Sequence, residues 1–231
     1  MEGFIYNVPF MLALTLGSYL LGVWVKKKSG LSLLHPFLIC IPVIAAVLKF
    51  TGVPVGFYME SNRMLDFLLG PSVVSLGLLM YDHLETIRKH LLSILVSVFT
   101  GSLVGVGSVY FLCRFFGLDE LFIKSMEAKS VTTPIAMDIT ASLGGNVSLA
   151  AVTVILCGFI GTVFGPMIIR MFHIDTPVAK GLALGCCSHG LGTSKAIEMG
   201  AVEGAVSGLA IALMGIMTAI VVPLFNMIFP I

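Results

Sequence analysis

KSVTTP, at residues 129–134, and SHGLGTSK, at residues 188–195, are two short polar stretches in a chain that is otherwise strongly apolar. Lipid offers no water to satisfy free backbone groups. Glycine, proline, hydroxyl and charged residues at membrane depth therefore indicate broken helices that line a cavity enclosed by protein. A pair of such breaks is typical of transporters. These two stretches decide the expected fold and the place where function should be sought.

The composition indicates the solvent in which the chain folds. Of its 231 residues, 58% are hydrophobic and 11% are charged, and the mean hydropathy is +1.07. Such a chain is too apolar for an ordinary soluble domain. The formal net charge of +1 provides no basic surface for nucleic acid. We therefore expect an integral membrane protein whose first partner is the lipid bilayer, with no nucleic-acid partner.

Six apolar runs are candidate membrane spans, at residues 3–25, 31–48, 67–81, 91–113, 147–169 and 205–229. A spanning helix needs roughly 20 apolar residues, so the third run is short. Lys26, Lys27 and Lys28 follow the first run, while Arg88 and Lys89 lie between the third and fourth. The positive-inside bias places both loops in the cytoplasm and the amino terminus outside. We expect a multi-pass protein of the cell membrane.

The first polar stretch opens a segment that is too short to cross the membrane. As a helix, residues 131–142 would measure roughly 18 Å, against about 30 Å of hydrocarbon. If both interrupted segments are re-entrant hairpins, the loop with Arg170, His173 and Lys180 lies in the cytoplasm, which the charge bias favours. If both cross, that loop lies outside. The predicted fold is one all-α integral membrane domain, residues 1–231, with about six full transmembrane helices and two broken or re-entrant half-helices. Breaks entered from opposite faces would fit an inverted structural repeat.

The first break combines a cation with hydroxyl groups directly before a short helix. Lys129 supplies the charge, and Ser130, Thr132 and Thr133 supply the hydroxyls. A helix start with free amides and the positive end of the helix dipole is suited to hold an anion. Ordinary capping, with a lysine that reaches toward lipid head groups, is the alternative. We favour anion binding because the second break repeats this chemistry.

The second break offers the same kinds of group, from Ser188, His189, Gly190, Gly192, Thr193 and Lys195. Its glycines allow backbone amides to approach a ligand closely. Lys195 and Glu198 are three residues apart on one helical face and would also pair with each other. For Lys195, substrate binding and simple ion pairing have nearly equal weight.

Three titratable side chains near the breaks have more than one interpretation. His189 is a substrate ligand, a proton carrier or a satisfied interior histidine. Asp138 and Glu198 are candidates for coupling transport to an ion, although Asp138 is more simply the mark of a helix end. Cys186 and Cys187 with His189 fall short of the four ligands of a structural zinc site, so we expect no metal. The coupling ion, proton or sodium, stays open.

An enzyme is the remaining class to consider, for instance an intramembrane hydrolase that uses Ser188 and His189. A nucleophile and its base must approach to about 3 Å, with a third group that orients the base, and adjacent residues rarely allow this. The sequence offers no better pair of carboxylates and no phosphate-binding loop. We therefore expect no catalytic residue and no cofactor.

Glycine and proline elsewhere in the chain are interpreted as architecture. Gly70 and Pro71 interrupt the third apolar run and predict a kink. Glycines at four-residue spacings predict close helix packing in lipid: Gly101, Gly105, Gly161, Gly165, Gly181, Gly185, Gly200, Gly204 and Gly208.

Three motifs resemble the LrgB/CidB-like family of membrane proteins: LGPS at residues 69–72, KSVTTPIA at 129–136 and SHGLGTSKA at 188–196. The resemblance covers nearly the whole chain. Ala128 stands where the family often has proline, and Lys195 stands where it often has arginine. Lysine keeps the charge but gives up bidentate binding of a carboxylate.

The resemblance implies two classes of function. Bacterial relatives are described as antiholin-like modulators of murein hydrolase export and autolysis. A plant plastid relative carries glycolate and glycerate, and other bacterial relatives are associated with pyruvate uptake, often with a smaller LrgA-like membrane partner. We expect transport of a small monocarboxylate by alternating access, with the carboxylate held between the two helix starts. The alternative is an antiholin-like modulator of membrane permeability. An LrgA-like partner and a homo-oligomer stay open.

Overall fold

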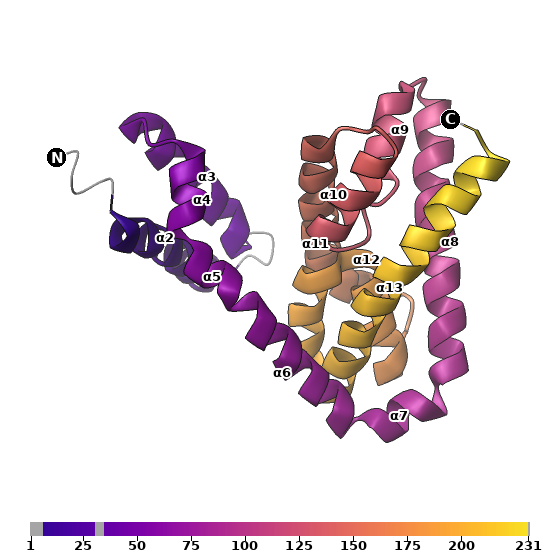
Figure 1. Cartoon of the computed structure of the whole chain (residues 1–231). Helices are drawn as coiled ribbons and strands as arrows, with labels where there is room; N and C mark the ends of the chain where they lie inside the picture. Colours follow the sequence, from indigo (N-terminus) through magenta and orange to yellow (C-terminus); the bar gives the residue numbers. More distant parts are fainter. Residues whose placement is uncertain (1–6, 31–34, 231) are drawn as a thin grey trace. The chain divides into compact units, whose positions relative to one another are not determined.

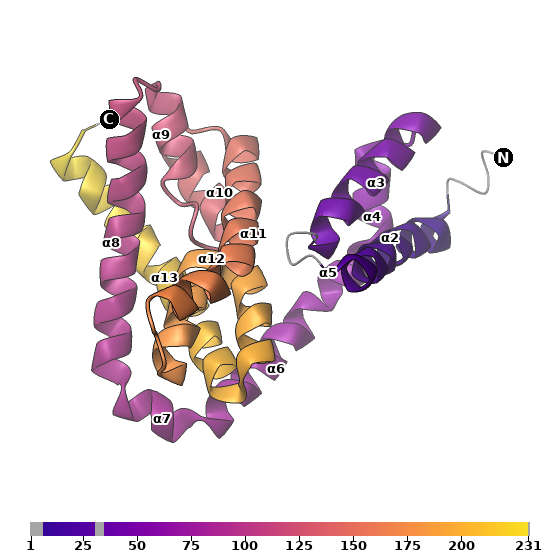
Figure 2. The same cartoon turned by 180° about the vertical axis from the view of Figure 1, so that it is seen from behind.

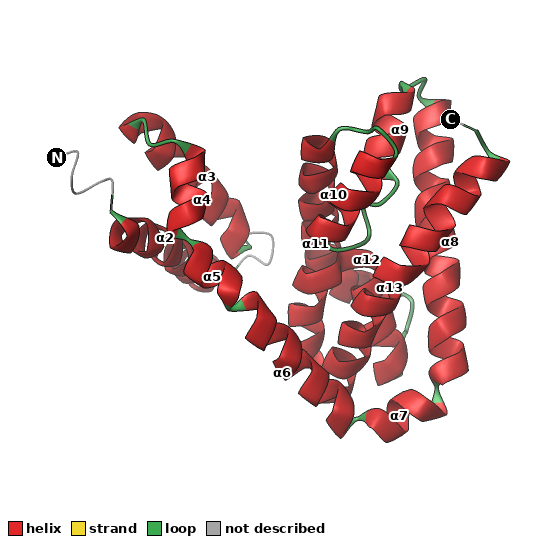
Figure 3. Ribbon diagram, viewed as in Figure 1, coloured by secondary structure: helices red, strands yellow, loops and turns green. Residues whose placement is uncertain are grey.

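A computed structural model describes residues 7–30 and 35–230 of the chain. All the regular secondary structure in these residues is helical, as Figure 3 shows. The first residues of the apolar runs predicted at 3–25 and 31–48 lie outside the described residues. The chain divides into two compact units, residues 1–75 and 76–231, which are described separately. That the whole chain acts as one membrane domain stays a prediction.

The first unit contains α2 (Val8–Ser29), α3 (Pro36–Thr51), α4 (Val55–Ser61), α5 (Arg63–Phe67) and the beginning of α6 (Leu69–Asp82). Helices α2 and α3 pack through a small core in which Met11, Leu48 and Val53 are buried. Gly22 is required at their contact, because a Cβ atom there would lie 2.6 Å from the Pro36 carbonyl oxygen. The first unit is thus a compact packing of short and long apolar helices.

The second unit contains α7 (Leu84–Lys89), α8 (Leu91–Phe115), α9 (Glu120–Met126), α10 (Thr133–Ser142), α11 (Val147–Met171), α12 (Pro177–Met199) and α13 (Ala201–Ile228). Its main core joins α8, α11 and α13 through Ile94, Val98, Val154, Val206 and Met214. Figure 1 shows α9, α10 and α12 as shorter pieces among these long helices, and Figure 2 shows the same arrangement from behind. The long helices α8, α11 and α13 thus form the main bundle of the second unit, and the interrupted segments lie among them.

Five helical stretches of the described residues are long and apolar enough to cross a membrane: Val8–Ser29, Arg63–Asp82, Leu91–Phe115, Val147–Met171 and Ala201–Ile228. The remaining predicted span, the second one at residues 31–48, corresponds to α3, which has 16 residues and falls short of that length. The kink predicted at Gly70 and Pro71 lies slightly earlier, because α5 ends at Phe67 and α6 begins at Leu69. Pro71 then falls in the first turn of α6, where a missing amide is tolerated.

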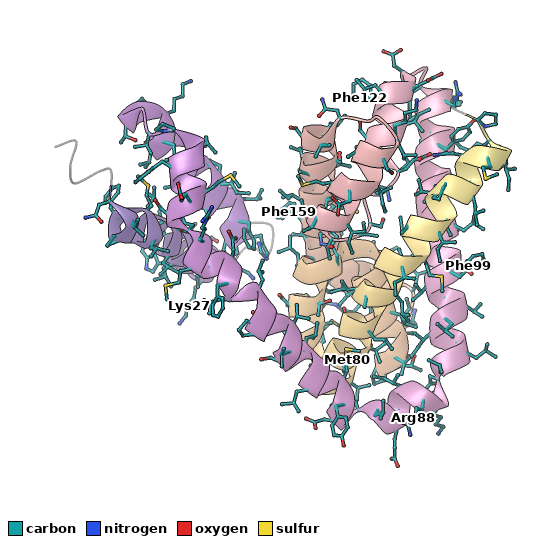
Figure 4. All side chains as sticks on the ribbon, viewed as in Figure 1. Lys27, Met80, Arg88, Phe99, Phe122 and Phe159 are labelled. Carbon is teal, nitrogen blue, oxygen red and sulfur yellow. The ribbon has the colours of Figure 1, made fainter. Side chains whose placement is uncertain are left out.

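The outer surface of the second unit is apolar. Leu92 is 76% exposed, Val104 61% and Phe115 82%. Phe99 on α8 and Phe122 on α9, labelled in Figure 4, are also exposed. A soluble protein rarely leaves so many large apolar side chains in water, whereas lipid accepts them. The described residues therefore form an all-α membrane protein, as the composition predicted.

The contacts of several glycines show in which direction α8 and the first half of α12 run along α13. On α8, Gly101 lies 4.0 Å from Met214 and Gly107 lies 3.5 Å from Phe225, measured from an ideal Cβ atom. On α12, such atoms at Gly181 and Gly185 would lie 2.5 and 2.6 Å from the carbonyl oxygens of Glu203 and Ser207. Both helices therefore run parallel to α13, and the four-residue glycine spacing permits close packing as predicted.

Four basic residues of the second unit, Arg88, Lys89, Arg170 and Lys180, share one end of it. Because α8 and α12 run parallel to α13, the starts of all three helices lie together. Arg88 and Lys89 end α7, immediately before α8, and Arg170 and Lys180 flank the connection between α11 and α12. Figure 4 shows Arg88 at this end. A shared cytoplasmic face for these residues is what the charge bias predicts for two hairpins.

Candidate functional site

Helix α12 is broken at His189, inside the second polar stretch. His189 has φ 37° and ψ −127°, values that no helix contains. An ideal Cβ atom at Gly192 would lie 2.5 Å from the Leu184 carbonyl oxygen, whereas residues eight positions apart in a straight helix are about 12 Å apart along its axis. The two halves of α12 therefore fold against each other, and Gly192 leaves the room that they need.

The second half of α12 runs back along α13. The Thr193 and Ser207 hydroxyl groups are hydrogen-bonded at 2.7 Å, and Ile197 lies against Gly204, 3.2 Å from an ideal Cβ atom to the Ile197 Cα atom. As the numbers on α12 rise, those on α13 fall, so this half is antiparallel to α13. Helix α12 is therefore a re-entrant hairpin that enters and leaves at the end where α13 begins.

Helices α9 and α10 form a second hairpin, around the first polar stretch. The Asn146 amide donates to the Ser125 hydroxyl oxygen at 2.8 Å, and an ideal Cβ atom at Gly145 would lie 3.0 Å from the Lys124 carbonyl oxygen. The chain thus leaves α9, passes through the break and α10, and returns to α9 before α11 begins. This hairpin enters at the end where α8 finishes, opposite to the entry of α12. Both interrupted segments are re-entrant, as the charge bias favoured.

The two breaks meet near the middle of the long helices. The Ser130 hydroxyl oxygen lies 3.6 Å from an ideal Cβ atom at Gly105, and the Cys186 Cβ atom lies 3.8 Å from one at Gly101. These two glycines are one turn apart, in the central part of the 25-residue α8. Lys129 also interacts electrostatically with the Cys187 thiol. The two breaks, which enter from opposite ends of the second unit, therefore both lie beside the central part of α8.

The first break presents its polar groups around the start of α10. The half-buried Lys129 ammonium group donates to the Ser130 hydroxyl oxygen at 3.2 Å. Thr132 is the N-cap residue of α10, but its side chain makes no capping hydrogen bond. Thr133 and Pro134 form the first turn, where proline fits. Amide groups at this helix start therefore stay available to an anionic ligand.

The second break is more tightly enclosed. The His189 Nε2 atom lies 3.0 Å from the Val154 carbonyl oxygen. Because a carbonyl only accepts, Nε2 must carry the hydrogen, which is the interpretation of His189 as a satisfied interior histidine. Ser188 is fully buried against Gly161, and its hydroxyl oxygen has no hydrogen-bond partner. An unpaired buried hydroxyl is uncommon and marks Ser188 as a candidate ligand contact.

An apolar cavity of about 140 Å³ adjoins this break. It is lined by residues of α11 and α12, among them Gly161, Leu184, Cys187 and Ser188. The space is large enough for a small organic molecule, but its lining suits the carbon skeleton of such a molecule and not its charge. The other hairpin brings one charged group to this break, Lys129, which interacts electrostatically with Cys187.

Three of the predicted residues, Lys195, Glu198 and Asp138, lie away from this meeting point. The Lys195 ammonium group forms a 2.6 Å ion pair with Glu198 on the exposed side of α12. Asp138 is exposed on α10. Gly192 packs against Leu184 and Ser188, whereas the exposed Gly190 has open space around it. The structure therefore gathers Lys129, Ser130, Thr132, Thr133, Ser188, His189 and Gly190 near the breaks. Thr193 is close by and bonded to α13.

The sequence analysis missed a polar pair beside the first break. Glu127 is 2% exposed, and its Oε2 atom accepts a hydrogen bond of 2.9 Å from the Asn226 amide. Glu127 is not among the residues that the sequence analysis singled out, because it lies in a charged part of the sequence, where burial is not expected. The available signal was Asn226, a carboxamide inside an otherwise apolar run. Within residues 7–30 and 35–230, no group of three or more His, Cys, Asp or Glu side chains is placed to hold a metal ion.

Comparison with known proteins gives a consistent family. The model of the LrgB-like family matches residues 15–228. The chain is 36% identical over 188 residues to the uncharacterized protein YwbG of Bacillus subtilis, which covers 81% of this chain and 84% of the relative. It is 35% identical over 219 residues to the uncharacterized protein YxaC of the same organism, 95% of each chain. It is 30% identical over 217 residues to the antiholin-like protein LrgB of Bacillus subtilis, 94% of each chain. No solved structure gives a significant match.

Proposed function

Because this chain belongs to the LrgB-like family of membrane proteins, we propose that it controls the passage of small solutes across the cell membrane, as a carrier of a small monocarboxylate. The observation that supports this function best is the meeting of two re-entrant breaks, entered from opposite ends, beside the centre of α8. This arrangement is typical of transporters that hold a substrate near the bilayer midplane.

The proposed substrate site is centred on the start of α10. Lys129 supplies countercharge for the carboxylate, and the amides of the uncapped α10 start supply hydrogen bonds. The hydroxyls of Thr132 and Thr133 recognise the substrate's own hydroxyl or keto oxygen. On the other hairpin, the unpaired Ser188 hydroxyl and the open backbone at Gly190 face the same substrate. No catalytic role is assigned to Ser188 or His189.

Transport would follow from relative movement of the hairpins. The α9–α10 hairpin and the α12 hairpin approach the site from opposite ends of the second unit. If one hairpin shifts against α8 while the other stays packed, the site opens toward one end at a time. Alternating access of this kind needs no change in the substrate-binding groups themselves.

Uptake of labelled pyruvate, glycolate and glycerate into proteoliposomes tests the proposal. A carrier saturates with substrate and shows counterflow of unlabelled substrate. Lys129→Ala and Thr133→Val are expected to abolish most of the uptake, whereas Lys89→Ala, a matched change of an exposed lysine in α7, leaves it intact. If flux is present and both site variants transport like the wild type, the substrate site is misplaced.

An antiholin-like role is the second candidate, and the names of several relatives favour it. Antiholin-like LrgB proteins of Bacillus mycoides and Bacillus cereus are 31% and 30% identical to this chain, each over 217 residues. In this role the protein would modulate membrane permeability and murein hydrolase export, with a smaller LrgA-like membrane protein or further copies of itself as partners. A pore gives solute flux that does not saturate and shows no counterflow, so the same vesicle experiment separates the two functions.

A further inference from the structure

Glu127 and Asn226 form a buried pair at the base of the α9–α10 hairpin. Glu127 lies between α9 and α10, outside the five long apolar helices, and Asn226 lies in the last turn of α13. The Asn226 Nδ2 atom donates to the Glu127 Oε2 atom at 2.9 Å. This hydrogen bond joins two side chains that are 99 positions apart in the sequence. It ties the base of the hairpin to α13.

The other oxygen atom of each side chain is buried and has no hydrogen-bond partner. These atoms are Oε1 of Glu127 and Oδ1 of Asn226. An ionised carboxylate and a carboxamide oxygen both accept only, so they cannot satisfy each other. Leaving two such oxygens unpaired inside a protein is costly. The pair is therefore one hydrogen short of a complete network.

We propose that Glu127 is a proton-binding site, in which an exchangeable proton on Oε1 donates to Asn226 Oδ1. A carboxylic acid and a carboxamide are complementary, because each has one donor and one acceptor that face the other. The single added proton would satisfy both unpaired oxygens and close a ring of two hydrogen bonds. The ligand of this site is the proton itself, and no other group is needed.

The surroundings of Glu127 suit proton exchange near neutral pH. The titratable groups that face it are Cys113 from α8 and Lys124 from α9, and α13 presents the neutral amide of Asn226. Burial raises the pKa of the Glu127 carboxyl group from 4.5 to about 7, and this outweighs the lowering of the pKa by Asn226 and Lys124. The proton is therefore neither permanently held nor permanently lost.

Proton exchange at Glu127 would act on the substrate site, a consequence that rests on the proposed transport function. Glu127 is two residues before Lys129, on the same hairpin. Release of the proton leaves a buried negative charge beside an unpaired carboxamide oxygen, which favours separation of the hairpin from α13. Movement of the hairpin carries Lys129 with it. A proton gradient would thereby bias the orientation of the site.

Thermal unfolding of the purified protein in detergent, measured between about pH 5 and 8, tests the proton site without any transport assay. A group whose pKa is raised on folding stabilises the protein at low pH, and this stability is lost as the pH rises through its folded pKa. We expect the melting temperature of the wild type to fall as the pH rises from about 5 to about 7, and to level off above the folded pKa of about 7. Glu127→Gln, whose amide can donate to Oδ1 and accept from Nδ2, is expected to keep the low-pH melting temperature and lose this fall.

Glu120→Gln is the matched control, since Glu120 is on the same hairpin but its side chain is 58% exposed in an ion pair with Lys124. It is expected to keep the wild-type pH dependence. A wild-type pH dependence in Glu127→Gln would overturn the proton site. Stabilisation of the wild type above neutral pH by sodium chloride but not by choline chloride, lost in Glu127→Gln, would also overturn it, because the oxygens would then hold a metal cation.

Vesicle uptake with and without a pH gradient separates this inference from the proposed function. Gradient-dependent uptake in the wild type that becomes gradient-independent in Glu127→Gln supports the coupling. Uptake that responds equally to the gradient in both proteins overturns the coupling and leaves the carrier function standing. If no monocarboxylate is taken up by any variant, the carrier function fails, and the unfolding experiment still decides the proton site.

Discussion

The two re-entrant hairpins of the second unit differ in how they are held. The α12 hairpin is packed closely by glycines. Added Cβ atoms at Gly181 and Gly185 would meet backbone oxygens of α13, and one at Gly192 would meet a backbone oxygen in the other half of α12. The α9–α10 hairpin is packed mainly by side chains, with Ala128, Val131 and Ala136 buried in the main core. Two side-chain hydrogen bonds add to this packing, Ser125 with Asn146 and Glu127 with Asn226.

This difference assigns different roles to the two hairpins. Close backbone packing allows little movement, because interiors packed at high density resist small displacements. A hairpin that is held by side-chain packing and a few polar contacts, without close backbone approach to the long helices, can shift more readily when one of these contacts changes. We infer that α12 is the fixed wall of the site and that α9–α10, which carries Lys129, is its movable wall.

The largest effect is expected from closing the space at Gly192. Gly192→Ala places a Cβ atom 2.5 Å from both the Leu184 carbonyl oxygen and the Ser188 Cβ atom. The α12 halves must then separate, at an expected cost of about 3 kcal/mol in unfolding free energy, the upper end for overpacking. Thermal unfolding in detergent measures the change. Gly190→Ala is the control, because no atom lies within 4 Å of its Cβ position, and it should change stability by less than about 0.5 kcal/mol. Equal stabilities of the two variants would mean that α12 is not tightly packed.

The next effect distinguishes the cations of the two hairpins. Lys129→Ala removes the countercharge at the α10 start, and the loss of a charge-assisted hydrogen bond of about 1.5–3 kcal/mol corresponds to at least a tenfold fall in uptake. Lys195→Ala is expected to change uptake less than about twofold, because Lys195 is already paired with Glu198 on the exposed side of α12. Initial rates over a range of substrate concentrations provide the measurement. A larger loss of uptake from Lys195→Ala than from Lys129→Ala would mean that the α12 hairpin, and not the α9–α10 hairpin, supplies the countercharge for the substrate.

The general form of the site could be predicted from the sequence because lipid imposes few solutions. Polar stretches at 129–134 and 188–195, too deep for free loops, had to be breaks enclosed by protein. The distribution of Arg88, Lys89 and Arg170 then favoured hairpins over crossings. The positions of these polar and basic residues in the sequence, together with lipid as the surrounding solvent, were enough for these conclusions.

The partners of individual side chains could not be predicted, because they depend on residues far away in the sequence. His189 bonds to the Val154 carbonyl, 35 positions away, and Glu127 bonds to Asn226, 99 positions away. Asn226 stands out as a carboxamide in an apolar run, but nothing in the local sequence shows that its partner is Glu127, or that Val154 is the partner of His189. Of the six predicted spans, five correspond to helical stretches long enough to cross a membrane, and α3 is shorter, with 16 residues.

A smaller effect is expected from the hydrogen bond between the second half of α12 and α13. Thr193→Val removes the hydroxyl that is bonded to Ser207 at 2.7 Å and leaves the Ser207 hydroxyl buried. The expected loss is about 1 kcal/mol of unfolding free energy, read from the melting temperature. Ser194→Ala is the control, since Ser194 is exposed and bonds only within its own helix. If Thr193→Val is as stable as Ser194→Ala, the α12 hairpin is held by packing alone.

The smallest effect is expected from the exposed ion pair on α12. Glu198→Gln removes the charge opposite Lys195, and both side chains are partly exposed to their surroundings. Pairs three residues apart on an exposed helix face contribute roughly 0.2–0.5 kcal/mol, so the melting temperature should change little and should be nearly insensitive to added salt. Glu127→Gln is the informative contrast, because it replaces a buried carboxyl group on the other hairpin. If Glu198→Gln alters the pH dependence of unfolding more than Glu127→Gln does, the carboxyl group responsible for that pH dependence is Glu198. The α12 hairpin would then be the candidate for the movable wall.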